Sequence, residues 1–403
     1  MTSRPTSRTR TSATRFLNPA VFSLLFIYMA IELLNRLART GKFDNHTLGD
    51  FIGFRHQSVE TLVRGHYEAG IYYPVPFLLL QDALNQLSLP WASALWFMMI
   101  LCSAMGAIFL SLKLLGLEQK PFRGALALMA TLSVIYFIQW DLRSVNLNLV
   151  VLFLVLMALS LRQSEKKIWA GTVLSLAIAA KLYPVLMLPY LLWRKEWSWL
   201  LATVLGLGVL FIMLPLSVLG LETSWNLSLS WVTHLFESRN LAEWPDYYKP
   251  LGRALKDSWE GALQPREIEG VLRLWQFLWL GLVAAVLARS RAWARSSDRL
   301  FADATALLFL PLLFSPTFQP HHAAVVLLTA MWLVRIAADK TDSPMRRVAS
   351  VLILVGAVVL IKTIDTWPER AVAIAGVMTL HLTGLALLAP NKPVRAGVTS
   401  NST

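Results

Sequence analysis

Apolar runs long enough to cross a bilayer recur along the whole chain of 403 residues. A helix needs about 20 predominantly apolar residues to span the roughly 30 Å of hydrocarbon. The charged fraction of 15% is below the roughly 25% of soluble domains, and the mean hydropathy is +0.54. A soluble fold would need every run to be a core helix, with too little charged surface to cover them. The sequence therefore predicts an all-α polytopic membrane protein.

The apolar runs predict about 12 helical segments in the membrane. The first lies near residues 16–37 and the last near 370–388. The segment 168–193 carries Lys181 and Pro184 in its middle and basic residues at both ends. We expect two short helices there that enter the membrane, break at KLYP and turn back. Other spans are expected near 91–115, 122–140, 145–161, 199–219, 272–289, 300–314, 321–338 and 347–362.

The domain organisation is a single membrane domain over residues 16–388, with cytoplasmic tails at 1–15 and 389–403. The outer loops are expected at 38–90 and 220–271. The first of these contains an apolar segment, 72–90, which is short and interrupted by prolines. We expect it to form a helix at the outer interface.

The net charge of +13 is distributed unevenly between the two predicted sides. Loops placed on the side of the N-terminus carry 22 Lys and Arg against 6 Asp and Glu, whereas the opposite loops carry 11 against 15. This asymmetry follows the positive-inside rule, so both termini are expected in the cytoplasm. The basic charge then orients the chain and does not indicate a nucleic-acid partner.

Metal and nucleotide motifs are not found in the sequence. It contains one cysteine, Cys102, and no HExxH, DxD, GxGxxG or GxxxxGK[ST] pattern. Cysteine metal clusters and an intrachain disulfide are therefore excluded. We expect no metal and no cofactor, and we expect the chemistry to lie in the outer loops and the adjoining helix ends.

Polar residues at membrane depth or at its outer edge are functional candidates because they are costly there. Asp50 follows the first span, with Asp44 as a weaker candidate. Lys181 needs a partner of opposite charge, which is either a lipid phosphate or the carboxylate of Asp303 or Glu32.

Other polar segments leave two interpretations open. Asp141 and Arg143 could simply pair, and Asn146 and Asn148 could cap a helix. The segment 243–255 contains aromatic side chains and Arg253. Arg253 is either a bidentate ligand of a phosphate or an ordinary loop residue. The turn FSPTFQPHH (314–322) ends in His321 and His322, either anion-binding and proton-transferring groups or interface residues.

The order of these pieces resembles glycosyltransferase family 87, the polyprenyl-phosphate-mannose-dependent mannosyltransferase-like membrane enzymes of the GT-C type. The resemblance covers roughly residues 20–340. Its motifs are GDF, YYPVP, an Asn after a short outer turn, KLYPVLMLPYLLWRKEW, PLGRAL and SPTFQPHH. The chain departs from the family pattern in having RSVN where members often have GQxN, and YYK where they often have NQS.

The resemblance implies a GT-C-like helical bundle with its active site at the outer face of the cell membrane. The donor would be a sugar on a polyprenyl phosphate, mannose being favoured, and the acceptor a lipid or glycan hydroxyl. The resemblance implies an inverting, metal-independent transfer with Asp50 as general base and His322 as a second catalytic residue. The implied substrate-binding residues are Lys181, Arg253, His321, Asn146 and Tyr73.

The residues are chemically consistent with this activity. A phosphate leaving group needs no protonation, so one carboxylate that deprotonates the acceptor, together with cations near the phosphate, suffices. A retaining mechanism would need a second carboxylate about 5 Å away, which Asp44 or Glu60 could supply. The alternatives are a flippase or transporter of lipid-linked sugars, which the broken helix at KLYP would suit, and a ligase with a different acceptor.

Overall fold

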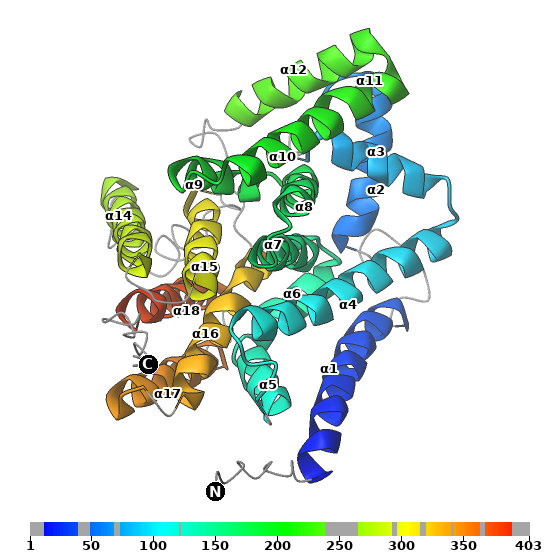
Figure 1. Ribbon diagram of the computed structural model, residues 1–403. Helices are drawn as coiled ribbons and strands as arrows, with labels where there is room; N and C mark the ends of the chain where they lie inside the picture. The colour runs from blue at the N-terminus through cyan, green and yellow to red at the C-terminus, as the bar shows by residue number, and fades with distance from the viewer. Residues whose placement is uncertain are drawn as a thin grey trace, which may run out of the picture.

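A computed structural model describes residues 12–38, 49–67, 73–120, 122–237, 265–291, 296–314, 320–339, 342–362 and 367–388. Every regular element in these ranges is a helix, as Figure 1 shows. The predicted all-α class is confirmed for this part of the chain.

The helices of the first half run from α1 to α9. Their bounds are α1 Ser12–Ala38, α2 Gly49–Arg64, α3 Val75–Asn85, α4 Leu89–Leu114, α5 Arg123–Ser133, α6 Ile135–Ser144, α7 Asn148–Gln163, α8 Lys167–Ala180, the 3₁₀ turn η1 Tyr183–Leu186 and α9 Met187–Trp193.

The second half begins with a helix that is continued through a π-helical turn. Its elements are α10 Trp197–Gly208, η2 Val209–Met213, α11 Leu214–Leu219, α12 Leu221–Glu237, α14 Pro265–Ser290, α15 Ser296–Phe314, η3 Pro320–Val325, α16 Val326–Ala338, α17 Pro344–Lys362 and α18 Trp367–Leu387.

Three helical stretches of the described chain are long and apolar enough to cross a membrane: Leu89–Leu114, Trp197–Leu219 and Pro344–Ile361. A fourth arises if the bent pair α5 and α6 is one span. Other apolar helices, such as α7 and α8, have 10–17 residues. A membrane location is plausible, but the prediction of about 12 spans is not confirmed.

The span expected near 122–140 is a bent pair of helices. The chain bends there by 72° between α5 and α6, at Val134. The sequence has no proline at this point, so the usual signal for a helix break is absent.

The expected break at KLYP and the expected short helix within 72–90 are both present. Lys181 adopts an extended backbone (φ −156°, ψ 128°) directly after α8, and η1 and α9 follow. Helix α3 begins after Pro74 with Pro76 in its first turn, where a missing N–H costs no helical hydrogen bond.

Close helix packing defines the centre of the fold. Helix α7 packs against α4 and α8, and α8 packs against α10. Gly171 of α8 lies so near α10 that an added Cβ would be 2.5 Å from the Cβ of Ala202 and 2.7 Å from the backbone nitrogen of Thr203. Small residues permit such close approach between helices in membrane proteins.

We expect the Gly171→Ala variant to be destabilised by about 1–3 kcal/mol, because its methyl group meets backbone atoms of α10 that cannot move aside. The thermal unfolding midpoint of the detergent-purified protein measures this. The matched control is Gly208→Ala on α10, the helix against which Gly171 packs, where an added Cβ has no neighbour within 4 Å. Equal midpoints for the two variants would contradict the packing argument.

Candidate active site

The turn between α6 and α7 adopts an unusual backbone for its residue type. Val145 has a left-handed conformation (φ 56°, ψ 39°), which β-branched residues rarely adopt. The N–H of Val145 donates to the Leu142 carbonyl (3.3 Å), and the N–H of Asn146 donates to the Asp141 carbonyl (3.2 Å). These are the two hydrogen bonds of a Schellman motif, in which glycine is usual at the left-handed position that Val145 occupies here. Such strain concentrates at functional sites.

The turn directs Asn146 toward Asp50 and Lys181. The Asn146 side-chain amide donates to Oδ2 of Asp50. Its Oδ1 accepts a hydrogen bond from the Lys181 ammonium (Nζ, 3.1 Å). The same ammonium donates to Oδ1 of Asn148 at 2.8 Å. One amide therefore joins a carboxylate from α2 to a cation from the break after α8.

Asp141 forms the buried base of this polar cluster. Its Oδ1 accepts a hydrogen bond from the Asn148 amide (2.8 Å), and its Oδ2 accepts one from the Leu149 N–H (3.1 Å). The carboxylate thus caps the first turn of α7 while holding Asn148 in position for Lys181. Asp141 is completely buried, as are nearly all atoms of Asn146 and Asn148.

The cluster has an open side. Asp50, Lys181 and Tyr73 are partly exposed, in contrast to the buried base. The Lys181 ammonium lies 5.9 Å from the centre of the Tyr73 ring, within the range of a cation–π interaction. A carboxylate, an ammonium and an aromatic ring therefore lie close together at the partly exposed border of the buried cluster.

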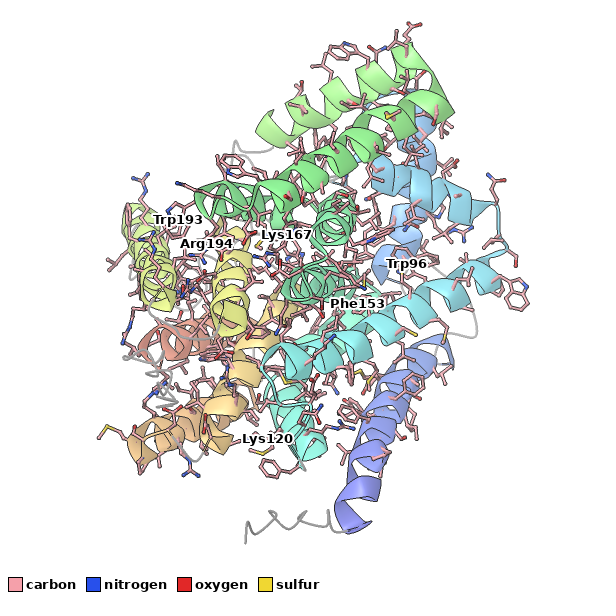
Figure 2. The ribbon with its side chains drawn as sticks, viewed as in Figure 1. Trp96, Lys120, Phe153, Lys167, Trp193 and Arg194 are labelled. Carbon is pink, nitrogen blue, oxygen red and sulfur yellow. The ribbon has the colours of Figure 1, made fainter. Side chains whose placement is uncertain are left out.

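An aromatic cluster holds the elements of the site in place. Phe51, which follows Asp50, stacks on Trp96 of α4 with ring centres 5.3 Å apart. Figure 2 shows Trp96 beside α2. The Trp96 indole donates to the Val145 carbonyl at 3.1 Å. Tyr73 stacks on Phe77 of α3 at 4.5 Å. Phe77 also lies edge-on to Trp96, with ring centres 6.2 Å apart, so α2, α3 and α4 are held together beside the α6–α7 turn.

Asp50 lies in the first turn of α2, a helix outside the membrane-capable segments. Burial raises the pKa of Asp50 above its ordinary value, and the Asn146 amide and the Lys181 charge oppose this rise. A raised carboxylate pKa brings a general base closer to its working pH.

Four of the seven predicted site residues are brought together: Asp50, Asn146, Lys181 and Tyr73. Of the other three, His322 lies in η3, which packs against α6 and α7. Arg253 and the side chain of His321 lie outside the described residues, as does Asp44. Glu60 is exposed on α2.

Asp141 is the functional candidate that the sequence interpretation treated as a partner of Arg143. Residues two apart on a helix do not face each other. Arg143 accordingly pairs with Glu32 of α1 (3.3 Å), and Asp141 points to the polar cluster. The helical spacing of the two residues could have shown that pairing them was the weaker interpretation.

The ion pairs suggested for Lys181 are also wrong. Asp303 accepts hydrogen bonds from Tyr190 (2.7 Å) and Ser290. Glu32 lies with Arg143. Lys181 instead has two amide oxygens as partners, with Asp50 and Asp141 as the carboxylates that favour its charge.

Metal binding has no candidate among the described residues, where no group of three or more His, Cys, Asp or Glu side chains is placed to hold an ion. The same part of the chain contains a second charged cluster, formed by Arg162, Glu165, Lys167 and Glu196. In Figure 2 its member Lys167 lies apart from Trp96, and the neighbouring Arg194 lies beside Trp193.

Comparison with known proteins identifies one family. The sequence model described as glycosyltransferase family 87 matches residues 72–316, which is more than half of the chain. No curated protein and no solved structure matches. The matched segment contains Tyr73, Asp141, Asn146 and Lys181, whereas Asp50 and His322 lie beyond its ends.

We expect Asp141→Ala to destabilise the protein, because the Asn148 amide and the Leu149 N–H lose their acceptor at a buried position. Each unsatisfied donor costs about 1–3 kcal/mol. The thermal unfolding midpoint should fall well below that of the control, Asp82→Ala, whose carboxylate on α3 is partly exposed. A midpoint equal to that of the control would contradict the structural role of Asp141.

Proposed function

Because the chain belongs to glycosyltransferase family 87, we propose that it transfers a sugar from a polyprenyl-phosphate donor to a lipid or glycan hydroxyl. Membership establishes a membrane glycosyltransferase; the donor, the side of the membrane and the residue roles are parts of the proposal. The observation that carries it is the hydrogen-bonded series Asp50–Asn146–Lys181, which presents one base and one cation on the same open side.

The proposed reaction is a single displacement. The acceptor oxygen bonds to the anomeric carbon as the bond from that carbon to the phosphate oxygen breaks. The electron pair leaves with the polyprenyl phosphate, and the acceptor proton passes to Asp50. The phosphate is a stable anion, so no acid is needed, and configuration at the anomeric carbon inverts.

Lys181 and Asn146 have separate roles in this proposal. The Lys181 ammonium stabilises the charge that develops on the phosphate, as a preorganised cation does in a site with restricted water. The Asn146 amide donates to Oδ2 of Asp50 and leaves Oδ1 for the acceptor proton. The ring of Tyr73 lies beside the Lys181 ammonium on the same side of the cluster.

The finer parts of the proposal follow the sequence expectations. Mannose is the favoured donor sugar, and the transfer needs no metal. The enzyme lies in the cell membrane with both termini in the cytoplasm and the Asp50 cluster toward the outside. His322, in η3 beside α6 and α7, is proposed as a second catalytic residue. His321 and Arg253 are proposed to contact the substrate.

A lipid-linked sugar transporter is the second candidate function. The observation that favours it is the break between α8 and η1 at Lys181, since transporters bind substrates at such interruptions. A transporter would need Lys181 to bind the phosphate and would not need Asp50 as a base.

We expect Asp50→Asn to lower kcat by about 10²- to 10⁴-fold, the usual contribution of a general base. The assay follows transfer from radiolabelled polyprenyl-phosphate sugars, with mannose, arabinose, glucose and galactose donors, in membranes with equal expression. The control is Glu60→Gln, an exposed carboxylate on the same helix. Full activity of Asp50→Asn would remove Asp50 as the base, and absence of transfer from every donor would favour the transporter.

The pH profile should also report Asp50. Only the ionised carboxylate accepts a proton, so activity falls as the pH drops through its raised pKa. In Asn146→Ala the amide that favours the ionised form is lost, the pKa rises further, and the acidic limb of kcat moves to higher pH.

The matched control for this shift is Asn85→Ala. The Asn85 amide also binds α2, through the Arg55 carbonyl and Ser58, but makes no described contact with Asp50. An acidic limb that stays in place in Asn146→Ala, or that moves equally in both variants, would refute the assignment.

A further inference from the structure

A cavity of about 370 Å³ lies apart from the Asp50 cluster, between the end of α2 and one side of α12. Its volume is within the range of about 300–1,000 Å³ that is common for small-ligand sites. The residues that line it are Gly65, His66, Tyr67, Asn226, Leu229, Ser230, Thr233 and His234. In Figure 1, α12 lies along one edge of the molecule, next to α11 and near α3.

Helix α12 has three distinct faces. Its buried face carries Ser224, Leu227 and Trp231, and its exposed apolar residues include Leu221, Trp225 and Val232. The cavity residues of α12 follow positions i, i+3, i+4, i+7 and i+8 from Asn226, which is one stripe of a helix. Four of these five residues are polar, so this stripe is neither core nor a typical lipid-facing surface.

Two hydrogen bonds fix the cavity relative to the rest of the protein. The backbone N–H of Tyr67 donates to the Ser230 hydroxyl at 2.9 Å, which joins the end of α2 to α12. The Tyr67 hydroxyl donates to the Tyr73 carbonyl at 2.9 Å. Because Tyr73 borders the open side of the Asp50 cluster, one side chain connects the cavity with the candidate active site.

The lining selects a class of ligand. It presents hydroxyl, carboxamide, imidazole and backbone groups, and the residues named above include no Lys, Arg, Asp or Glu. A phosphate would lack a Lys or Arg partner there, and Mg²⁺ or Ca²⁺ would lack a carboxylate. A neutral ligand with many hydroxyl groups matches both the donors and the acceptors of the lining.

The position of the cavity sets the length of that ligand. Gly65 directly follows α2 and lies 15 residues after Asp50, which corresponds to about 22 Å at the helical rise of 1.5 Å per residue. A single sugar cannot reach both places. A longer glycan could place one hydroxyl at Asp50 and a distant sugar in the cavity.

We propose that this cavity is a remote acceptor subsite, which binds a neutral sugar residue of an oligosaccharide chain while another residue of that chain is glycosylated at Asp50. The role of the cavity as an acceptor subsite rests on the proposed glycosyltransferase function, whereas the binding of a glycan in the cavity does not. With such a subsite, the enzyme recognises an acceptor that contains several sugar residues.

Binding is tested first without any donor. Purified full-length protein is titrated with neutral tetrasaccharides of mannose, arabinose, glucose or galactose, each compared with the corresponding methyl glycoside. We expect at least one tetrasaccharide to bind more tightly than its methyl glycoside. Asn226→Ala and Thr233→Val should each weaken that binding by about 2- to 12-fold, the loss of one neutral hydrogen bond.

The matched control is Thr223→Val, on α12 but outside the cavity lining. It should bind as the wild type does, and equal thermal unfolding midpoints should show that all variants are folded. Failure of every tetrasaccharide to bind, or equal binding by the cavity variants and the wild type, would overturn the proposal.

Transfer kinetics then separate this proposal from the proposed function. With a tetrasaccharide acceptor, Thr233→Val should raise the acceptor KM and leave the donor KM unchanged, whereas a monosaccharide acceptor should show no difference. An equal loss with both acceptors would contradict a remote subsite. If transfer fails with every donor, the proposed function falls, while the binding titration still decides whether the cavity holds a glycan.

Discussion

The candidate site depends on the placement of one ammonium group among amide and carboxylate oxygens. Lys181 follows directly on an apolar helix, where an unpaired charge is costly. The oxygens of Asn146 and Asn148 accept its hydrogen bonds, while Asp50 and Asp141 favour its charge. These partners come from α6, the α6–α7 turn, α7 and the start of α2, so the break after α8 and those elements must be positioned correctly together.

Sequence reasoning predicted the helical class and the helix breaks that prolines produce. Pro74 and Pro184 act locally, through a missing N–H and a restricted preceding residue, so their effect is readable from the sequence. The 72° bend at Val134 has no such local signal. Hydropathy also could not show that several apolar runs form helices of 10–17 residues, because it measures composition and not where the backbone turns.

The members of the site were predictable, but their contacts were not. Asp50, Asn146 and Lys181 are distant in sequence, and their meeting depends on tertiary packing such as the stacking of Phe51 on Trp96. Asp141 was misjudged because a nearby opposite charge suggested a pair, although helical geometry points Arg143 elsewhere. The family match supports the activity but ends short of Asp50, so the role of that residue depends on the geometry.

The stereochemistry of the transferred sugar tests the central claim most directly. The anomeric configuration of the product, determined by NMR and compared with that of the polyprenyl-phosphate donor, distinguishes one displacement from two. A single base at Asp50, with Lys181 on the leaving phosphate, predicts inversion. Retention would require a second carboxylate as nucleophile and would contradict the account.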